Sequence, residues 1–298
     1  MDFVLSERDK KVHEIELDLL RKLKNICDKY QLKYFANAGT LLGAARHKGF
    51  IPWDDDIDVS MDWEDYKVFL QVAPAECKYP YFFQSHLTEE GAEVDHVKIR
   101  RSDTTGFSKW EHENIRDPEH NLGIWLDVFP MFNIPESLTE REEKKCRIMS
   151  LWKAIRGYNA KKCIEYGYEP NPTYAQYIKN YEVLSQTMSI TEIKDQFLQE
   201  CVCDDLTDEI GETSFRTYDE RFIYKRSWYT NAIDLPFENT TIRCPEKYDE
   251  ILTKAYGNWR QPVINSAVHE MEHVDPDTPY IDYLEKKNVD RFGERNKQ

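Results

Sequence analysis

The chain has 298 residues, of which 40% are hydrophobic, so it is long and apolar enough to bury a substantial core. Its formal net charge of -15 disfavours nucleic-acid binding, because affinity for phosphate backbones comes from Lys and Arg. It has no apolar run of about 18 residues and no secretory-signal layout, so we expect no transmembrane segment and a cytoplasmic location. The seven cysteines are odd in number and scattered, which favours reduced thiols.

The N-terminal segment of the chain has the apolar periodicity of a helix. A capping box at Ser6 is followed by apolar residues three and four positions apart, which predicts an amphipathic helix up to Tyr30. A strand over 32–35 then leads through a turn at 37–40 into a brief helix over 41–46. The amides at the start of such a helix face back toward the turn, an arrangement that binds anions.

Strands and helices alternate through the middle of the chain. We expect strands over 57–61, 81–85, 94–101 and 124–129, and a helix that starts at Asp62 and is ended by Pro74. From Glu136 onward the sequence is charged and helical, with helices over 138–159, 191–204 and 245–256. The prediction is an α+β fold, with a mixed-sheet core in residues 1–135, flanking helices and a mostly helical part in 136–298. The boundary between them is soft, and one domain is the alternative.

Four carboxylates fall within the five positions from Asp54 to Asp58. Like charges this close repel, so they either face solvent or are neutralised by hard metal ions. Asp56 and Asp58 share a strand face, which suits chelation of Mg²⁺ or Mn²⁺. A solvated acidic turn is the alternative, and the apolar Ile57 and Val59 make it the weaker one.

Asp127 is a third candidate for this cluster, because an Asp amid apolar strand residues is costly to bury unless it is paired or metal-bound. A Gly-Thr turn entering a helix, an Asp-x-Asp on the next strand and one further acidic strand residue form the layout of the nucleotidyltransferase fold. We therefore expect Asp56, Asp58 and Asp127 to be catalytic and to bind metal.

The segment from Gly39 to Asp58 closely resembles the signature of the LicD family, whose bacterial members transfer phosphocholine from CDP-choline to cell-surface glycans. Fukutin and fukutin-related protein are distant relatives of that family. The resemblance implies that Asp56 and Asp58 are the metal-binding pair, that Asp127 is a third ligand or the base, and that Gly39 and Thr40 cradle phosphate. By this interpretation Asp54 and Asp55 form the turn and are not ligands.

Three basic or titratable residues are further candidates for substrate binding. Arg46 and His47 lie where a helix gives way to the loop before the acidic cluster. Arg46 suits a bidentate phosphate contact, and an ion pair with Asp54 or Asp55 is an equal alternative. Lys98 alternates with apolar neighbours, so its side chain faces either the active-site cleft or solvent.

One competing motif is His269-Glu270-Met271-Glu272-His273, which satisfies the H-E-x-x-H pattern of zinc peptidases. Such a site needs a long amphipathic helix and a third downstream ligand, whereas this segment lies between Pro262 and Pro276 in a polar tail. A zinc metallopeptidase using His269 and His273 is therefore the weaker hypothesis.

The predicted function is metal-dependent transfer of a phospho-alcohol group, first of all phosphocholine, from a CDP-alcohol donor to a hydroxyl of a cell-surface glycan or its precursor. CMP is the leaving group. A true nucleotidyltransferase acting on a small phosphorylated substrate would use the same acidic residues and is the first alternative. A non-catalytic glycan-binding protein on this fold is the alternative from another class.

Overall fold

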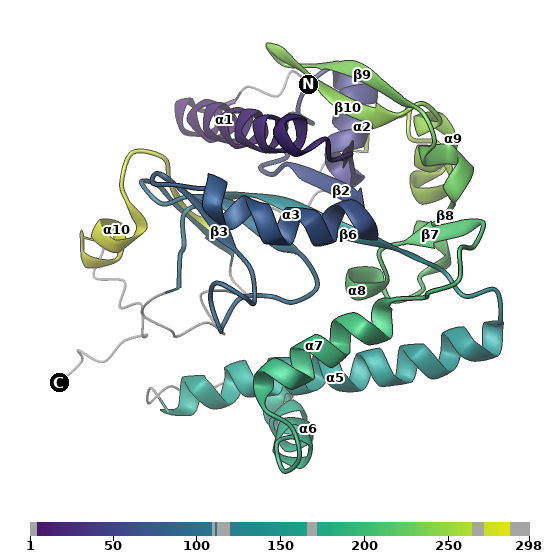
Figure 1. The fold of residues 1–298 in the computed structure, drawn as a ribbon. Helices are drawn as coiled ribbons and strands as arrows, with labels where there is room; N and C mark the ends of the chain where they lie inside the picture. Colours follow the sequence, from purple (N-terminus) through teal and green to yellow (C-terminus); the bar gives the residue numbers. More distant parts are fainter. Residues whose placement is uncertain (1–4, 109–110, 112–119, 166–171, 264–270, 287–298) are drawn as a thin grey trace.

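The computed structural model describes residues 5–108, 111, 120–165, 172–263 and 271–286. Its architecture is α+β, as predicted, with helices packed around a mixed sheet (Figure 1). Within the described residues no helix is both long and apolar enough to cross a membrane. The helices are α1 (Glu7–Tyr30), α2 (Ala38–His47), α3 (Trp63–Glu76), α5 (Leu138–Glu165), α6 (Ala175–Leu184), α7 (Ile190–Cys201), α8 (Thr213–Arg216), α9 (Tyr248–Tyr256) and α10 (Tyr280–Lys286).

Among these residues the main sheet has seven strands. Five of them run in the order β1-β2-β6-β4-β3, β7 pairs with β6, and β8 pairs with β7. Only β2 and β6 are parallel to each other, and the other pairs in this sheet are antiparallel. The bounds are β1 (Phe35–Ala36), β2 (Asp58–Asp62), β3 (Tyr81–Gln84), β4 (Val97–Arg101), β6 (Ile124–Asn133), β7 (Glu209–Gly211) and β8 (Ile223–Lys225).

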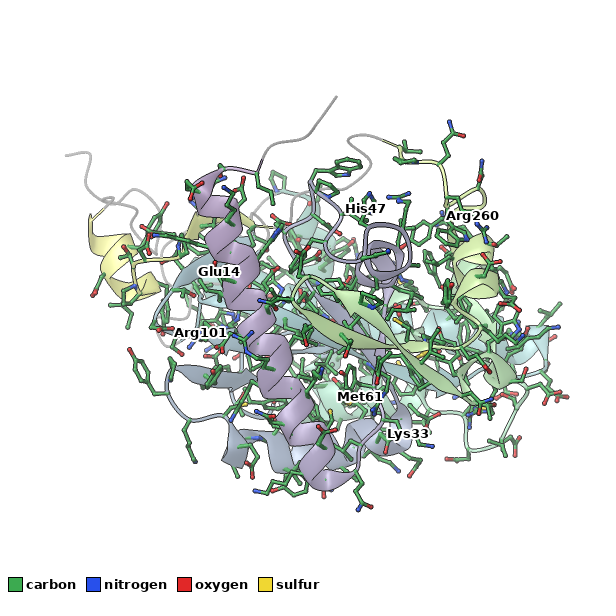
Figure 2. All side chains as sticks on the ribbon, turned by 90° about the horizontal axis from the view of Figure 1, so that it is seen from above. Glu14, Lys33, His47, Met61, Arg101 and Arg260 are labelled. Atoms are coloured by element: carbon green, nitrogen blue, oxygen red, sulfur yellow. The ribbon has the colours of Figure 1, made fainter. Side chains whose placement is uncertain are left out.

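Two smaller antiparallel pairs complete the fold: β9 (Ala232–Phe237) with β10 (Thr240–Pro245), and β5 (Thr105–Ser108) with β11 (Met271–Asp275). Seen from above, α1 crosses the molecule beside the β9–β10 hairpin (Figure 2), and the Lys24 ammonium donates to the Thr241 carbonyl at 3.1 Å. Phe237 and Ile242 of the hairpin are fully buried in the same hydrophobic core as Leu23 of α1.

The predicted N-terminal helix is confirmed, including its capping box: the Ser6 hydroxyl accepts from the Asp9 amide at 3.2 Å. Helix α2 begins at Ala38, earlier than predicted, so Gly39 and Thr40 lie in its first turn. The expectation that Pro74 ends α3 is wrong, because the helix continues to Glu76. Proline removes only its own N–H, and the Ala73 carbonyl still accepts from the Cys77 amide at 2.9 Å.

The C-terminal part is largely helical, and Figure 1 shows α5, α6 and α7 as a layer apart from the sheet. Strands β7 to β11 in this part were not predicted. A second core, around Ile148 of α5 and Phe197 of α7, includes Phe132 and Ile134 at the end of β6. This packing and the β6–β7 pair join the two predicted parts, and the boundary at 135/136 stays a prediction.

Candidate active site

Two predicted site residues from distant parts of the sequence lie side by side. In the parallel pair of β2 and β6, Asp58 is opposite Asp127. Neighbouring strands are about 4.8 Å apart, and side chains at paired positions point to the same face of the sheet. The Asp127 amide donates to the Ile57 carbonyl at 3.0 Å, and the fully buried Val59 and Val128 continue the register. Burial of these apolar residues fixes the two carboxylates as neighbours.

The start of α2 holds the backbone of Asp58 on both sides. The Asp58 amide donates to the Thr40 hydroxyl at 2.8 Å, and the Asp58 carbonyl accepts from the Asn37 amide at 3.0 Å. Thr40 is only 3% exposed. Its hydroxyl therefore positions Asp58 in this structure, while the phosphate-binding role of Gly39 and Thr40 stays a prediction.

The carboxylate of Asp54 packs against the first turn of α2. A Cβ atom placed on Gly39 would lie 2.6 Å from Asp54 Oδ2, so glycine at this position allows the close approach. The amides at a helix N-terminus carry partial positive charge, which stabilises a nearby carboxylate. Gly39 therefore already has a carboxylate beside it, at the position where the sequence predicts phosphate.

Asp54, Asp55 and Asp56 form one cluster, with one carboxylate oxygen of each lying within 4.8 Å of the others. Asp56 is only 9% exposed. The Asp55 carboxylate also accepts from the Met271 amide of β11 at 3.3 Å. The residues that the sequence analysis assigned to turn formation thus lie with the predicted ligand Asp56.

Asp127 is surrounded by donors. Its Oδ1 accepts from the Lys98 ammonium at 2.8 Å and its Oδ2 from the Trp125 indole at 2.7 Å, while His96 Nε2 lies 3.2 Å from Oδ1. Burial opposes ionisation of Asp127, but the positive charges of Lys98 and His96 hold its pKa well below its usual range. Lys98 is 8% exposed, so of the two predicted alternatives it faces the site and not solvent.

His96 is a site residue that the sequence analysis missed. Its Nδ1 lies 2.9 Å from Asp95 Oδ1, and its Nε2 lies 3.3 Å from Glu93 Oε2. Burial and the Lys98 charge lower the pKa of His96, but Asp127 and Asp95 outweigh them and raise it to about 10. The imidazolium therefore neutralises these carboxylates. One signal was available, because His96 has the same strand parity as Lys98 and Arg100.

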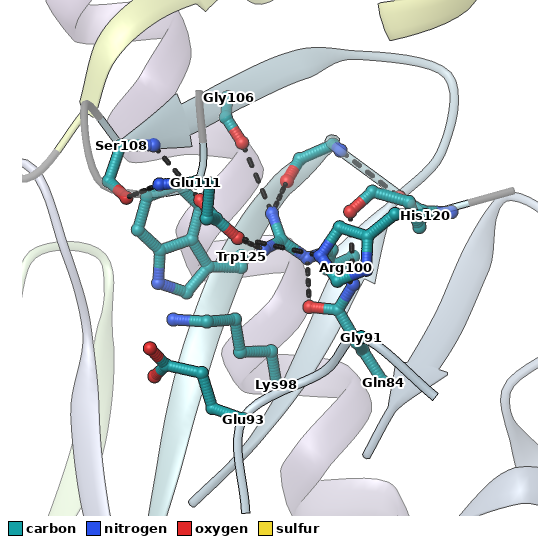
Figure 3. Close-up of polar contacts among 12 residues, drawn as sticks. Gln84, Gly91, Glu93, Lys98, Arg100, Gly106, Ser108, Glu111, His120 and Trp125 are labelled. Atoms are coloured by element: carbon teal, nitrogen blue, oxygen red, sulfur yellow. Dashed lines mark hydrogen bonds and ion pairs between the residues drawn. The ribbon is translucent and has the colours of Figure 1, made fainter. Parts of the chain in front are cut away.

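The basic face of β4 is braced by a buried polar network (Figure 3). Arg100 is fully buried and donates to Gln84, the carbonyls of Gly106 and Gly123, and Glu111. The Trp125 ring centroid lies 4.5 Å from the Lys98 ammonium and 4.9 Å from the Arg100 guanidinium. These contacts hold Lys98 and Trp125, and through them Asp127, in one orientation.

Arg46 and His47 lie at the other end of α2. Arg46 comes seven residues after Gly39 in α2, about 10 Å along the helix axis, so it lies two turns away from the start of the helix. The Arg46 guanidinium donates to the Trp259 carbonyl at 2.7 Å, and the His47 ring lies 6.4 Å from the Trp53 ring. The structure thus groups Gly39, Thr40, Asp58, Lys98 and Asp127 closely, and does not bring Arg46 and His47 to the start of α2.

The C-terminal part contributes further polar groups near Asp58 that the sequence analysis did not assign. Glu212 accepts from the Asn37 side chain and from Arg216 Nε, the latter at 2.9 Å. No periodic pattern in the sequence joins these residues, because they meet only through tertiary packing.

The zinc-peptidase motif lies partly outside the described residues, since these do not include His269. His273 lies in β11, where its ring stacks on Phe107 with centroids 4.6 Å apart. Residues 271–275 are extended and not helical, so they cannot present the helix face that such a zinc site requires.

The donor set of the site fits a hard divalent cation. The ligand atoms available from Asp54, Asp55, Asp56, Asp58 and Asp127 are all carboxylate oxygens, which Mg²⁺ and Mn²⁺ prefer. A carboxylate has about four lone-pair sites, so Asp127 can still accept a ligand beside its contacts with Lys98, Trp125 and His96. The clustering of three carboxylates within 4.8 Å also needs positive charge to offset repulsion.

Comparison with known proteins matches residues 31–144 to the family model described as LicD/FKTN/FKRP, nucleotidyltransferase domain. The lipopolysaccharide cholinephosphotransferase LicD of Haemophilus influenzae is 50% identical over 56 residues, which cover 19% of this chain and 21% of that protein. The ribitol 5-phosphate transferase FKRP of Homo sapiens is 33% identical over 73 residues, covering 24% of this chain and 15% of that protein. The matched segments thus span about a fifth or less of these relatives' own length.

Proposed function

Because residues 31–144 match the nucleotidyltransferase-domain model of the LicD/FKTN/FKRP family, we propose that the protein transfers a phospho-alcohol group from a CDP-activated donor to a hydroxyl of a cell-surface glycan or its precursor. Phosphocholine is the first candidate for the group transferred, and CMP is released. The observation that carries the proposal is the pairing of Asp58 with Asp127 beside the start of α2. The relatives named as cholinephosphotransferase and ribitol 5-phosphate transferase support this reaction class.

Asp56, Asp58 and Asp127 would hold Mg²⁺ or Mn²⁺, which when bound would neutralise the diphosphate of the donor. The amides at the start of α2 would orient one donor phosphate. Thr40 fixes the backbone of Asp58, and Lys98 fixes the carboxylate of Asp127. Neither aspartate therefore needs to reorganise during the reaction.

The acceptor hydroxyl oxygen would form a bond to the phosphorus that carries the alcohol. In line with it, the bond from this phosphorus to the bridging oxygen of CMP would break, and the hydroxyl proton would leave to solvent. Phosphoryl transfer of this kind depends mainly on positioning and charge neutralisation, so it makes little demand on a strong base. This agrees with Asp127, whose low pKa makes it a weak base.

The test is CMP release from a panel of CDP-choline, CDP-ribitol and CDP-glycerol with glycan acceptors and excess Mg²⁺. Asp58→Asn should abolish turnover and leave thermal stability unchanged or slightly raised, because it relieves carboxylate repulsion. The matched control is Glu14→Gln on the exposed face of α1, which should behave as wild type (Figure 2). Wild-type turnover by Asp58→Asn would refute the site.

A true nucleotidyltransferase is the second candidate, because the same carboxylates would serve it. The products separate the two reactions. Transfer of phospho-alcohol releases CMP, whereas nucleotidyl transfer from the same donor leaves CMP attached to the acceptor and releases the phospho-alcohol. A glycan-binding protein without catalytic activity would bind the acceptor and release no CMP from any donor.

A further inference from the structure

Helix α1 carries an acidic residue in its apolar face. Glu16 lies four residues after Val12 and four before Leu20, and all three are buried. Glu16 is 0% exposed, and neither of its carboxyl oxygens has a hydrogen-bond partner in the part of the chain that the structure describes. Burying a polar group without a partner is costly, so this side chain needs an explanation.

The face of α1 that carries Glu16 covers the acidic turn. His13, three residues before Glu16, donates from Nε2 to the Asp54 carbonyl at 3.0 Å. Val12, four residues before Glu16, lines a pocket together with Asp54 and Asp55. Residues three and four apart lie on one helix face, so Glu16 is the next side chain along the stripe that contacts this turn.

The aspartates of the candidate site act electrostatically on Glu16. Burial, followed by the negative charges of Asp55, Asp54, Asp58 and Asp127, raises the pKa of Glu16 well above its usual value. This agrees with the geometry of α1, whose buried face contacts the turn at Asp54 through His13. A positive charge placed among these groups would satisfy both the cluster and the buried Glu16 oxygens.

Solvent reaches the cluster from the same side. A pocket of about 250 Å³ is lined by Arg8, Val12, His13, Asp54, Asp55 and Met271. Since Asp54, Asp55 and Asp56 each offer an oxygen within 4.8 Å of the others, an ion entering here meets several ligands at once. Glu16 would supply a further oxygen from the interior side.

We propose that Glu16 is a ligand of a divalent cation bound by Asp54, Asp55 and Asp56, on the side of the cluster that α1 covers. All donors are oxygens, so the ion is of the Mg²⁺ or Mn²⁺ class. The proposal rests on the proposed function only in the cation ligand Asp56, which both share, and it assigns a residue outside the segment from Gly39 to Asp58 to cation binding.

The test is to titrate metal-free protein with Mn²⁺ and to measure binding from the loss of the electron paramagnetic resonance signal of free Mn²⁺. Glu16→Gln keeps the size of the side chain and removes its charge, and it should weaken Mn²⁺ binding at least tenfold or remove one bound ion. Glu14→Gln, on the exposed side of the same helix, is the matched control and should bind as wild type. Without metal, Glu16→Gln should melt at or above the wild-type temperature.

Wild-type affinity and stoichiometry in Glu16→Gln would overturn the proposal, as would the absence of Mn²⁺ binding by the wild-type protein. If Glu16→Gln does not fold, Glu16→Asp takes its place: weaker Mn²⁺ binding supports the proposal, and unchanged binding overturns it. CMP release by wild-type protein is measured separately. Its absence would count against the proposed function, whereas the binding comparison alone decides the role of Glu16.

Discussion

Substitution of Lys98 by Met tests how the site holds Asp127. The Lys98 ammonium and Asp127 Oδ1 are 2.8 Å apart, and the two side chains are 9% and 3% exposed. Removing one partner of a buried ion pair costs about 3–5 kcal/mol, because the remaining charge stays buried without compensation. His96 and Trp125 still contact Asp127 in the variant, so we expect the lower end, about 3 kcal/mol.

Urea unfolding in the presence of EDTA measures this loss for Lys98→Met, Asp127→Asn and the double variant. The double variant should lose less stability than the sum of the single variants, by at least about 1 kcal/mol, because each single change removes the same interaction. Lys67→Met is the matched control, since Lys67 pairs with Glu64 at 2.8 Å on the surface. That change should cost about 0–1 kcal/mol. The reasoning would be refuted if the losses of the two single variants simply added up in the double variant, or if Lys98→Met and Lys67→Met lost the same free energy of unfolding.

Two further predictions concern packing and pH. A Cβ atom on Gly43 would lie 2.5 Å from the Gly49 backbone carbonyl, so Gly43→Ala should lower the free energy of unfolding in urea by about 1–3 kcal/mol. A Cβ atom on Gly39 would instead meet the carboxylate of Asp54, so Gly39→Ala should mainly weaken Mn²⁺ binding. Burial lowers the pKa of Lys194 from its usual 10.5 to about 8, so between these values the unfolded chain binds more protons and stability should rise with pH. In unfolding curves recorded between pH 8 and 10, the free energy of unfolding of the wild type should rise by roughly 2–3 kcal/mol, and Lys194→Met should flatten this rise. An unchanged slope in the variant would show that another group causes the rise.

The sequence predicted Asp58 and Asp127 because both depend on a short-range pattern. A strand has a side-chain period of two, and an acid within an apolar strand is costly, so each residue stood out alone. Their meeting also required that β2 and β6 be neighbours, which the expected fold supplied. Helix α1 was predictable for the same reason, since its cap and its apolar stripe are both local signals.

Glu16 and His96 show what the sequence could not supply. Glu16 visibly interrupts the apolar stripe of α1, but only the docking of α1 onto the turn at Asp54 reveals what it faces. His96 immediately precedes β4 and has the same strand parity as Lys98. Its partners Glu93 and Asp95 lie in the irregular segment before the strand, where no periodic pattern predicts which side chains meet. The β9–β10 hairpin had a signal in the sequence, since apolar residues alternate on both sides of Glu238, whereas the three-residue β7 gains its hydrogen bonds only from tertiary pairing.

The charges around the site imply an order of binding. Lys98 and His96 are turned toward Asp127, and Arg100 is turned toward Glu111, so these cations neutralise the protein's own carboxylates. Among the described residues that contact Asp58 and Asp127, the group left to meet an anionic donor is the start of α2, beside which Asp54 already lies, in a chain of formal charge -15. A nucleoside diphosphate should therefore bind only after a divalent cation. Isothermal titration should detect CDP-choline and CMP competing for the protein with Mg²⁺ present and should detect neither in EDTA. Equal affinity for CDP-choline in both conditions would mean that the protein's own cations hold the donor. That result would refute the proposal that the aspartates bind the donor through a divalent cation.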